Sequence, residues 1–219
     1  MALYSGPISM FGAKVEIAAR EKGLNFELIM VAYDAQSGYS PKHPEVLRIN
    51  PKRQVPVLVH GEVEIFDSTQ IFEYLEELKP NPPLWPQGIP ARSHARLLEH
   101  RADEVYFPHV IRLMGLQENL QDDAAVAAID ACTCYYADMD RQLADGEWLA
   151  GSYSFADIAF YMAALFGERQ GAPLDDLTPK LLAWRERMTK RPAVRAVVGA
   201  MGRWLALNGR AVPAFMRGI

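Results

Sequence analysis

The first 80 residues alternate between two hydrophobic periods, one typical of strands and one typical of helices. The pattern predicts short strands at residues 3–4, 26–31, 57–60 and 64–66, and helices at residues 10–22, 42–49 and 67–78. The order is β-α-β and then β-β-α, which indicates a small mixed sheet with helices packed on it. We therefore expect residues 1–79 to form one α/β domain.

A proline-rich segment interrupts this pattern at residues 80–90. It forms neither a helix nor a central strand, and we interpret it as a linker. The helical period then continues, so residues 91–219 should form an all-helical domain. The expected helices are 91–118 with a bend at Pro108, 123–144, 154–169, one that begins at Pro179 under a Thr178 cap, and a last one from Pro192. Ser154 and Asp157 have the spacing of a capping box.

Composition and charge narrow the class of protein. Half of the 219 residues are apolar, which is typical of a globular chain, and the net charge is −4. This charge argues against nucleic acid or an anionic membrane as the main partner. The chain shows neither a signal-peptide pattern nor an apolar run long enough to span a bilayer. Cys132 and Cys134 point in different directions on a helix, so we expect no metal and a cytoplasmic location.

Residues 54–74 are the most informative stretch, because a strand ends and a helix begins there at Asp67 and Ser68. Free backbone N–H groups and the positive end of a helix dipole favour a carboxylate at such a place. The same two residues also fit simple helix caps. A cis Val55-Pro56 bond would turn the Val55 N–H and C=O toward a peptide. Together these features indicate a site for a small anionic, peptide-like ligand.

Three motifs carry a resemblance to a known family. They are Asn50-Pro51 with Gln54-Val55-Pro56-Val57-Leu58 and Asp67-Ser68, then residues 151–158, and finally Leu182-Ala183-Trp184 leading to Arg191-Pro192-Ala193-Val194. With the linker, they resemble the soluble glutathione S-transferases over nearly the whole chain. The resemblance implies a thioredoxin-like N-terminal domain and an all-helical C-terminal domain. The surroundings of Ser9 resemble the serine-using tau, theta and zeta classes, and we expect a bacterial source.

The resemblance also implies roles for single residues. Val55, before the cis Pro56, would pair with the cysteinyl backbone of glutathione. Asp67 and Ser68 would hold its γ-glutamyl end, although many relatives have Glu in place of Asp67. Gln54 would contact the ligand backbone or glycine carboxylate. Further anchors in the preceding loop would be Lys42 and His43.

A hydroxyl that faces the glutathione sulfur is the chemical requirement of such a site. The thiolate is the reactive species, and lowering a thiol pKa from about 8.5 by about two units requires roughly 2.7 kcal/mol. A hydroxyl donor and a helix N-terminus could supply this. Ser9 is the first candidate, and it also fits an ordinary N-cap. Ser5 is the second candidate, and Tyr4 would suit the tyrosine-using classes.

The resemblance implies that the glutathione thiolate attacks an electrophilic carbon of a hydrophobic molecule. Its pocket would include Tyr106, Met114, Phe160 and Phe166, with Trp204 nearby, although such residues also fit ordinary core packing. We expect a homodimer with glutathione as co-substrate and no metal, nucleic acid or membrane partner. Two alternatives remain. One is another glutathione-dependent reaction, such as isomerisation, dehalogenation or ether cleavage. The other is a non-catalytic interaction protein of the stringent-starvation type.

Overall fold

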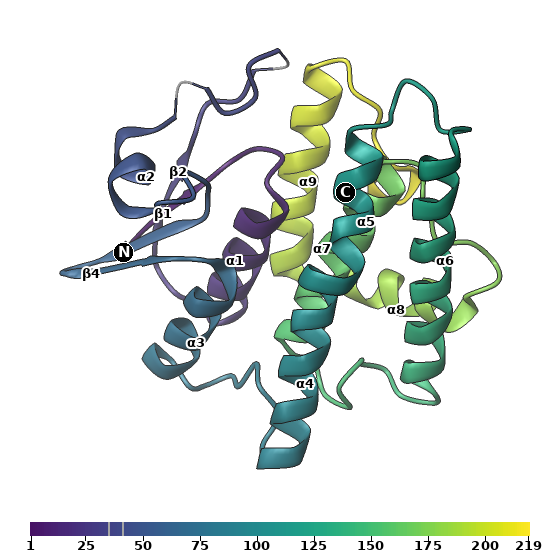
Figure 1. Ribbon diagram of the computed structural model, residues 1–219. Coiled ribbons are helices and arrows are strands. Elements are labelled where there is room, and N and C mark those ends of the chain that lie inside the picture. Colours follow the sequence, from purple (N-terminus) through teal and green to yellow (C-terminus); the bar gives the residue numbers. More distant parts are fainter. Residues whose placement is uncertain (35, 41) are drawn as a thin grey trace. The chain divides into compact units, whose positions relative to one another are not determined.

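The computed structural model describes residues 1–34, 36–40 and 42–219 (Figure 1). These residues pack into two compact units. One contains residues 1–83, 192–210 and 218–219, and the other contains residues 84–191 and 211–217. The last long helix, α9 (Pro192–Leu207), therefore packs with the N-terminal unit. The predicted domains, residues 1–79 and 91–219, are continuous in sequence and assign α9 to the helical domain. The compact units differ from these domains because α9 packs with the N-terminal residues.

A four-stranded sheet forms the centre of the first unit. Its strands are β1 (Ala2–Ser5), β2 (Glu27–Met30), β3 (Val57–His60) and β4 (Val63–Phe66). The strand order is β2-β1-β3-β4, with β1 parallel to β2 and antiparallel to β3, and β3 antiparallel to β4. The helices of this part are α1 (Met10–Glu21), α2 (Pro44–Ile49) and α3 (Ser68–Leu78). This arrangement confirms the predicted thioredoxin-like fold.

Alternation along β1 assigns its side chains to opposite faces of the sheet. Tyr4 packs with Val31, Val46 and Val57, and Val46 belongs to α2. Ser5 has the opposite orientation and lies against Gly12 in the first turn of α1. The two faces of β1 therefore contact different helices, which matters for the hydroxyl groups considered below.

A buried ammonium group joins the C-terminal ends of α1 and α3. The Lys22 side chain is fully buried, and its Nζ donates to the carbonyl oxygens of Lys79 and Pro82 at 2.8 and 3.1 Å. It also pairs with the Glu76 carboxylate at 2.6 Å. An isolated buried charge would be costly, but these three acceptors match the three donors of an ammonium group. Lys22 thus anchors both α3 and the start of the proline-rich segment.

The second unit is helical. Its helices are α4 (Ile89–Arg101), α5 (Phe107–Met114), α6 (Asp123–Leu143), α7 (Phe155–Arg169) and α8 (Pro179–Lys190) (Figure 1). A short 3₁₀ turn follows at Ala214–Met216. The predicted all-helical fold of this half is confirmed. Among the described residues, no helix combines the length and apolar character needed to cross a membrane.

The predicted helix at residues 91–118 differs from the structure. It begins at Ile89, widens into a π-helical turn over Ala102–Tyr106 and ends at Met114. The Phe107 N–H donates to the Ala102 carbonyl, five residues back. Pro108 explains this change, because its ring crowds the preceding turn and it has no N–H to donate. The expected bend at Pro108 is thus accommodated by a wider turn just before it.

Asp157 is the polar centre of the helical unit. Its carboxylate accepts hydrogen bonds from the backbone N–H groups of Leu149 and Ser154, each at 3.0 Å. It also accepts from the Ser154 hydroxyl at 3.1 Å and the Trp184 indole N–H at 2.9 Å. The predicted capping box at Ser154 is present. Burial raises the pKa of Asp157 to about 6, against the lowering effect of these donors.

Thr178 occupies the predicted N-cap position of α8, but its side chain does not form the capping hydrogen bond. Its hydroxyl donates to the Asp175 carbonyl at 3.2 Å. The free N–H of Leu181 donates instead to the Asp140 carboxylate, which comes from α6, at 2.9 Å. A tertiary contact therefore replaces the local cap.

The raised pKa of Asp157 predicts that stability falls as pH rises. Between the ordinary value of 3.8 and about 6, the native protein holds a proton that the unfolded chain has lost. The free energy of unfolding should lose about 3 kcal/mol across this window. Asp157→Asn should lack this part of the pH dependence, as measured by urea unfolding from pH 4 to 7. Exposed Asp145→Asn is the matched control, and equal pH slopes for all three proteins would contradict the prediction.

Candidate functional site

The register of the sheet brings the candidate residues together at the strand ends on one side of the sheet, which is called the sheet edge below. Tyr4 pairs with Val57, and Val57 pairs with Phe66. One residue further along each strand are Ser5, Pro56 and Asp67, so these three positions lie in one row across the sheet. Helices α1 and α3 both begin at this edge, because each follows closely on the end of β1 or β4. The site therefore combines two helix N-termini with the start of β3.

Ser9 and Ser5 lie together at the N-terminus of α1. Ser9 is the N-cap, and its Oγ accepts from the Gly12 N–H at 3.0 Å. The Ser5 and Ser9 hydroxyls both lie against Gly12. A side chain at this position would collide with Ser5 Oγ and would lie 3.1 Å from Ser9 Oγ. The bond from Gly12 uses a lone pair of Ser9 and not its proton. Within the described residues, the Ser9 hydroxyl has no acceptor and can donate to a ligand.

Tyr4 lies on the other face of the sheet. Its ring packs 5.0 Å from the His43 ring, in the core beneath α2. Ser5 and Ser9 thus share the α1 side, whereas Tyr4 is separated from them by the strand. Which hydroxyl faces a bound sulfur stays a prediction, and this geometry favours the two serines.

The segment before β3 is held by a buried asparagine. Asn50 is 3 % exposed, and its Nδ2 donates to the Gln54 carbonyl at 2.6 Å. Its Oδ1 accepts from the Lys52 N–H at 2.9 Å. The Val55-Pro56 bond is cis. Among the described residues, no hydrogen bond occupies the N–H or C=O of Val55.

Asp67 and Ser68 form the other side of the site. Asp67 is the N-cap of α3, and its carboxylate accepts from the N–H groups of Thr69 and Gln70 at 3.1 and 3.4 Å. The cap interpretation is therefore correct for Asp67. Its φ of 77° lies in the left-handed region, which is strained for a residue other than glycine and is common at binding sites. Ser68 is 3 % exposed, and its hydroxyl has no partner among the described residues.

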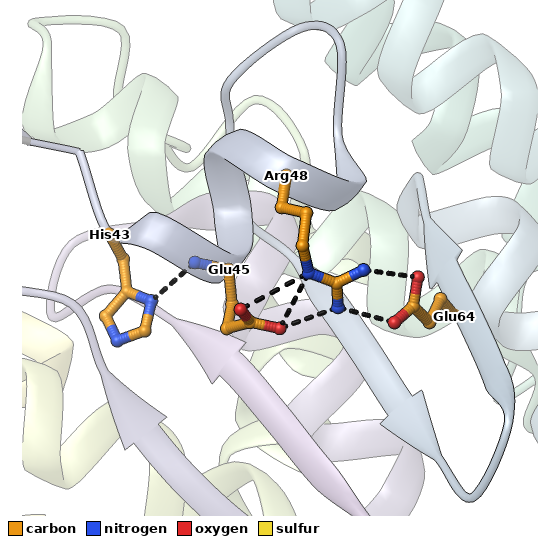
Figure 2. A network of polar contacts seen from close by, with 4 residues as sticks. All are labelled: His43, Glu45, Arg48 and Glu64. Carbon is orange, nitrogen blue, oxygen red and sulfur yellow. Dashed lines mark hydrogen bonds and ion pairs between the residues drawn. The ribbon is translucent and has the colours of Figure 1, made fainter.

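An ion-pair network fixes α2 against β4. Arg48 on α2 pairs with Glu45 at 2.6 Å and with Glu64 of β4 at 2.5 Å (Figure 2). Hydrogen bonds from Arg48 lower the pKa of both carboxyls. At the start of α2, His43 Nδ1 accepts from the Glu45 N–H at 3.2 Å. The nearby Lys42 Nζ lies 5.9 Å above the Tyr39 ring. These contacts leave His43 as a helix cap, and its role as a ligand anchor stays a prediction.

An apolar cavity of about 610 Å³ adjoins Ser5 within the same unit. Its walls come from the end of β1, from β2, and from α1 and α9. Sequence reasoning named Trp204 and missed Tyr33 and Met201, which also line this space. One available signal was the spacing of Val197, Met201 and Trp204, which share one face of a helix. The packing of that face against α1 could not be inferred from spacing.

The four predicted pocket residues lie in the helical unit. Tyr106 and Phe160 are buried in an aromatic cluster, where the Tyr106 and Tyr136 hydroxyls lie 2.5 Å apart. Phe166 is also buried, and Met114 is 38 % exposed. Their contact with a ligand stays a prediction. In the described part of the chain, His, Cys, Asp and Glu side chains form no group of three or more suited to a metal ion.

Two family models match this chain, one in each half of the sequence. The chain matches the family model "Glutathione S-transferase, N-terminal domain" over residues 3–83. It matches the model "Glutathione S-transferase, C-terminal domain" over residues 104–192. Together the matches include the sheet edge described above and most of the helical unit.

The individual relatives include glutathione S-transferases and stringent starvation protein A homologues. The chain is 44 % identical to Glutathione S-transferase 1 of Dianthus caryophyllus over 53 % of this chain and 49 % of that protein. It is 37 % identical to a Stringent starvation protein A homolog of Coxiella burnetii over 49 % of this chain and 48 % of that protein. The aligned part thus spans about half the length of each relative.

Solved structures give the same fold. A glutathione S-transferase from Methylobacterium radiotolerans, in complex with glutathione sulfonate, superposes with a TM-score of 0.75. The match covers 90 % of this chain and 93 % of that chain at 25 % identity.

The role of Asn50 can be tested by truncation. Asn50→Ala removes two hydrogen bonds from a buried loop, so the free energy of unfolding should fall by about 1–3 kcal/mol. Urea unfolding measures this change, and exposed Asn25→Ala should leave stability within about 0.5 kcal/mol. Equal stability of the two variants would show that Asn50 does not hold the segment before β3.

Proposed function

Since the chain belongs to the glutathione S-transferase family, we propose that it binds glutathione and transfers its sulfur to an electrophilic carbon of a hydrophobic molecule. The row of Ser5, Pro56 and Asp67 at one sheet edge, with two helix N-termini beside it, carries this proposal. We further propose that the protein is a cytoplasmic homodimer without a metal cofactor.

The peptide would lie along the start of β3. The unpaired N–H and C=O of Val55 would form two hydrogen bonds with the cysteinyl backbone, as in an added strand. Gln54, held in place by Asn50, would contact the ligand backbone or the glycine carboxylate. This arrangement would leave the cysteine side chain directed toward Ser5 and Ser9, beside the N-terminus of α1.

The γ-glutamyl end would lie at the N-terminus of α3. Its carboxylate would accept from the Ser68 hydroxyl and benefit from the positive end of the helix dipole. Its ammonium group would face the Asp67 carboxylate, which remains an acceptor although it already caps the helix. The strained backbone of Asp67 is consistent with a residue held for binding.

Ser9 would stabilise the glutathione thiolate. Its oxygen accepts from Gly12, which orients the hydroxyl, and its proton would be donated to sulfur. The N-terminus of α1 would favour the same negative charge. In the reaction, sulfur forms a bond to the electrophilic carbon, the leaving group departs with its electron pair, and the thiol proton passes to solvent. Ser5 is the second candidate for the same task.

The acceptor would use apolar surface near this sulfur. The predicted residues Tyr106, Met114, Phe160 and Phe166 remain candidates, and of these Met114 is the most exposed. We add the cavity lined by Ser5, Tyr33, Met201 and Trp204, because a volume of about 610 Å³ suits a small organic molecule.

A second candidate function is a non-catalytic interaction protein. The similarity to a Stringent starvation protein A homolog favours it. The unoccupied hydrogen-bonding groups of Val55, Ser9 and Ser68 favour an enzyme instead. Another glutathione-dependent reaction would use the same first unit and differ only in the acceptor.

Calorimetry should detect glutathione binding with a Kd between about 1 µM and 1 mM, a range typical of enzyme substrates. Asp67→Asn should weaken it at least about fivefold, because the ammonium group loses its counter-charge. The exposed Asp145→Asn should bind like the unaltered protein. Absence of binding at several millimolar would overturn both glutathione-dependent proposals and leave the interaction protein.

Ser9→Ala should keep glutathione binding and lower turnover of a chlorinated aromatic acceptor by about 10–100-fold near pH 6.5. The reason is that the pKa of the bound thiol should rise by about one to two units. The pH dependence of thiolate absorbance and of kcat measures this shift.

Two further variants separate chemistry from stability. Ser9→Thr keeps a hydroxyl and a cap, so it should retain most of the activity, and exposed Ser93→Ala should retain all of it. If Ser9→Ala shows an unchanged rate and thiol pKa, the donor is Ser5 or a backbone N–H.

A further inference from the structure

The cavity beside Ser5 has an apolar body. Side chains of β2, of Val31 just after it, and of α1 and α9 form its walls, and they include Ala13, Leu28, Met30, Val197 and Met201. All of these belong to the first compact unit. Met30 is 47 % exposed, although it is a large apolar residue at the end of an edge strand. An exposed apolar wall of this kind favours a ligand with a hydrophobic part.

The carboxylate that lines the cavity is neutralised. Glu16 is the acidic residue among the lining side chains, and its Oε1 accepts from Arg20 Nε at 2.9 Å and Nη2 at 2.7 Å. Glu16 is 5 % exposed, whereas the Arg20 side chain is 39 % exposed, so only the carboxylate side of this pair is shielded from solvent. The Glu16–Arg20 pair therefore adds polarity to one wall but little net charge.

Two further guanidinium groups lie at the α9 end of the cavity. Arg203 lines it directly. Arg210 lies 5.4 Å from the ring centre of Tyr33 and 5.9 Å from that of Trp204, and both of these aromatic residues line the cavity. Within the described chain, neither Arg203 nor Arg210 forms an ion pair with a carboxylate. The main-chain oxygen of Ile219, the last residue of the chain, lies beside Gly199 and Arg203 without forming an ion pair among the described residues. Positive groups still outnumber negative ones at this end of the cavity.

The aromatic contacts hold part of this charge in place. The Tyr33 and Trp204 rings lie 5.5 Å apart at 82°, and cation–π contacts with both rings favour this position of the Arg210 guanidinium. A guanidinium with little remaining freedom loses less entropy when it binds a carboxylate. An apolar wall that ends in positioned cations is complementary to an amphipathic anion.

We propose that this cavity binds an organic acid with an apolar body, whose carboxylate pairs with Arg203 and Arg210, and that such acids are the preferred acceptor class. The second half of this inference rests on the proposed glutathione reaction, whereas binding of the acid does not. With a chloroaromatic acid, the glutathione sulfur forms a C–S bond and the C–Cl bond breaks. Chloride leaves with the electron pair, and the thiol proton passes to solvent.

Binding is tested without glutathione, by calorimetry with octanoate and with octan-1-ol as the uncharged counterpart. The unaltered protein should bind octanoate more tightly than octan-1-ol. The double variant Arg203→Gln/Arg210→Gln should weaken octanoate binding about tenfold or more and change octan-1-ol binding by less than about twofold. Arg203→Lys/Arg210→Lys should keep most of the preference, because the charge remains.

Arg195→Gln is the matched control, since Arg195 is exposed on the same helix and does not line the cavity. It should bind both probes like the unaltered protein. No octanoate binding at about 10 mM, or an equal loss for both probes in the double glutamine variant, would overturn the inference.

Acceptor preference is tested with glutathione and two chloroaromatic compounds, 4-chloro-3-nitrobenzoate and 4-chloro-3-nitrobenzamide. The double glutamine variant should lower kcat/KM for the acid about tenfold more than for the amide. If glutathione binds and both acceptors lose activity equally, the acid preference fails while the proposed function stands. If octanoate binds as expected but glutathione does not, the proposed function fails, the acceptor half fails with it, and the acid site stands.

Discussion

The pairing register of β1, β3 and β4 is the constraint on which the candidate site depends. It aligns the ends of three strands, so that Ser5 lies in one row with Pro56 and Asp67, which come from a hairpin about 50 residues later in the sequence. A shift of one residue would turn the side chains of a strand to the opposite face. Tyr4 would then exchange faces with Ser5, and the serine hydroxyl would move from α1 to the core under α2. In this register Leu3, Tyr4, Val57 and Leu58 are all buried, and the Ser5 hydroxyl lies on the α1 side of the sheet.

Several side chains at this edge combine folding with binding. Ser9 and Asp67 cap their helices, and both retain a group that can interact with a ligand: the proton of Ser9 and the remaining lone pairs of Asp67. The choice between a cap and a binding residue is therefore not exclusive. A helix N-terminus exposes donors that need a partner, and the same donors attract an anion.

Much of the fold could be predicted from the sequence because its signals are local. The strand and helix periods, the linker prolines and the Ser154–Asp157 box each act within a few residues. Ser9 and Asp67 were found in the same way, from their places before helices. The packing of α9 with the first unit, the Asp140 cap of α8 and the walls of the cavity depend on distant contacts. The π-helical turn before Pro108 was missed because a proline predicts a disturbance and not its form.

The placement of α9 has a consequence for how this chain can be divided. The chain leaves the first unit after Pro83 and returns to it at Pro192, so that unit is discontinuous in sequence. A fragment that ends at the linker would contain the whole sheet but lack the helix that covers α1. Insertion or shuffling of genes at the proline-rich segment would therefore not transfer a self-sufficient module. The two parts can be distinguished in the sequence, but the first unit needs residues from both ends of the chain to fold.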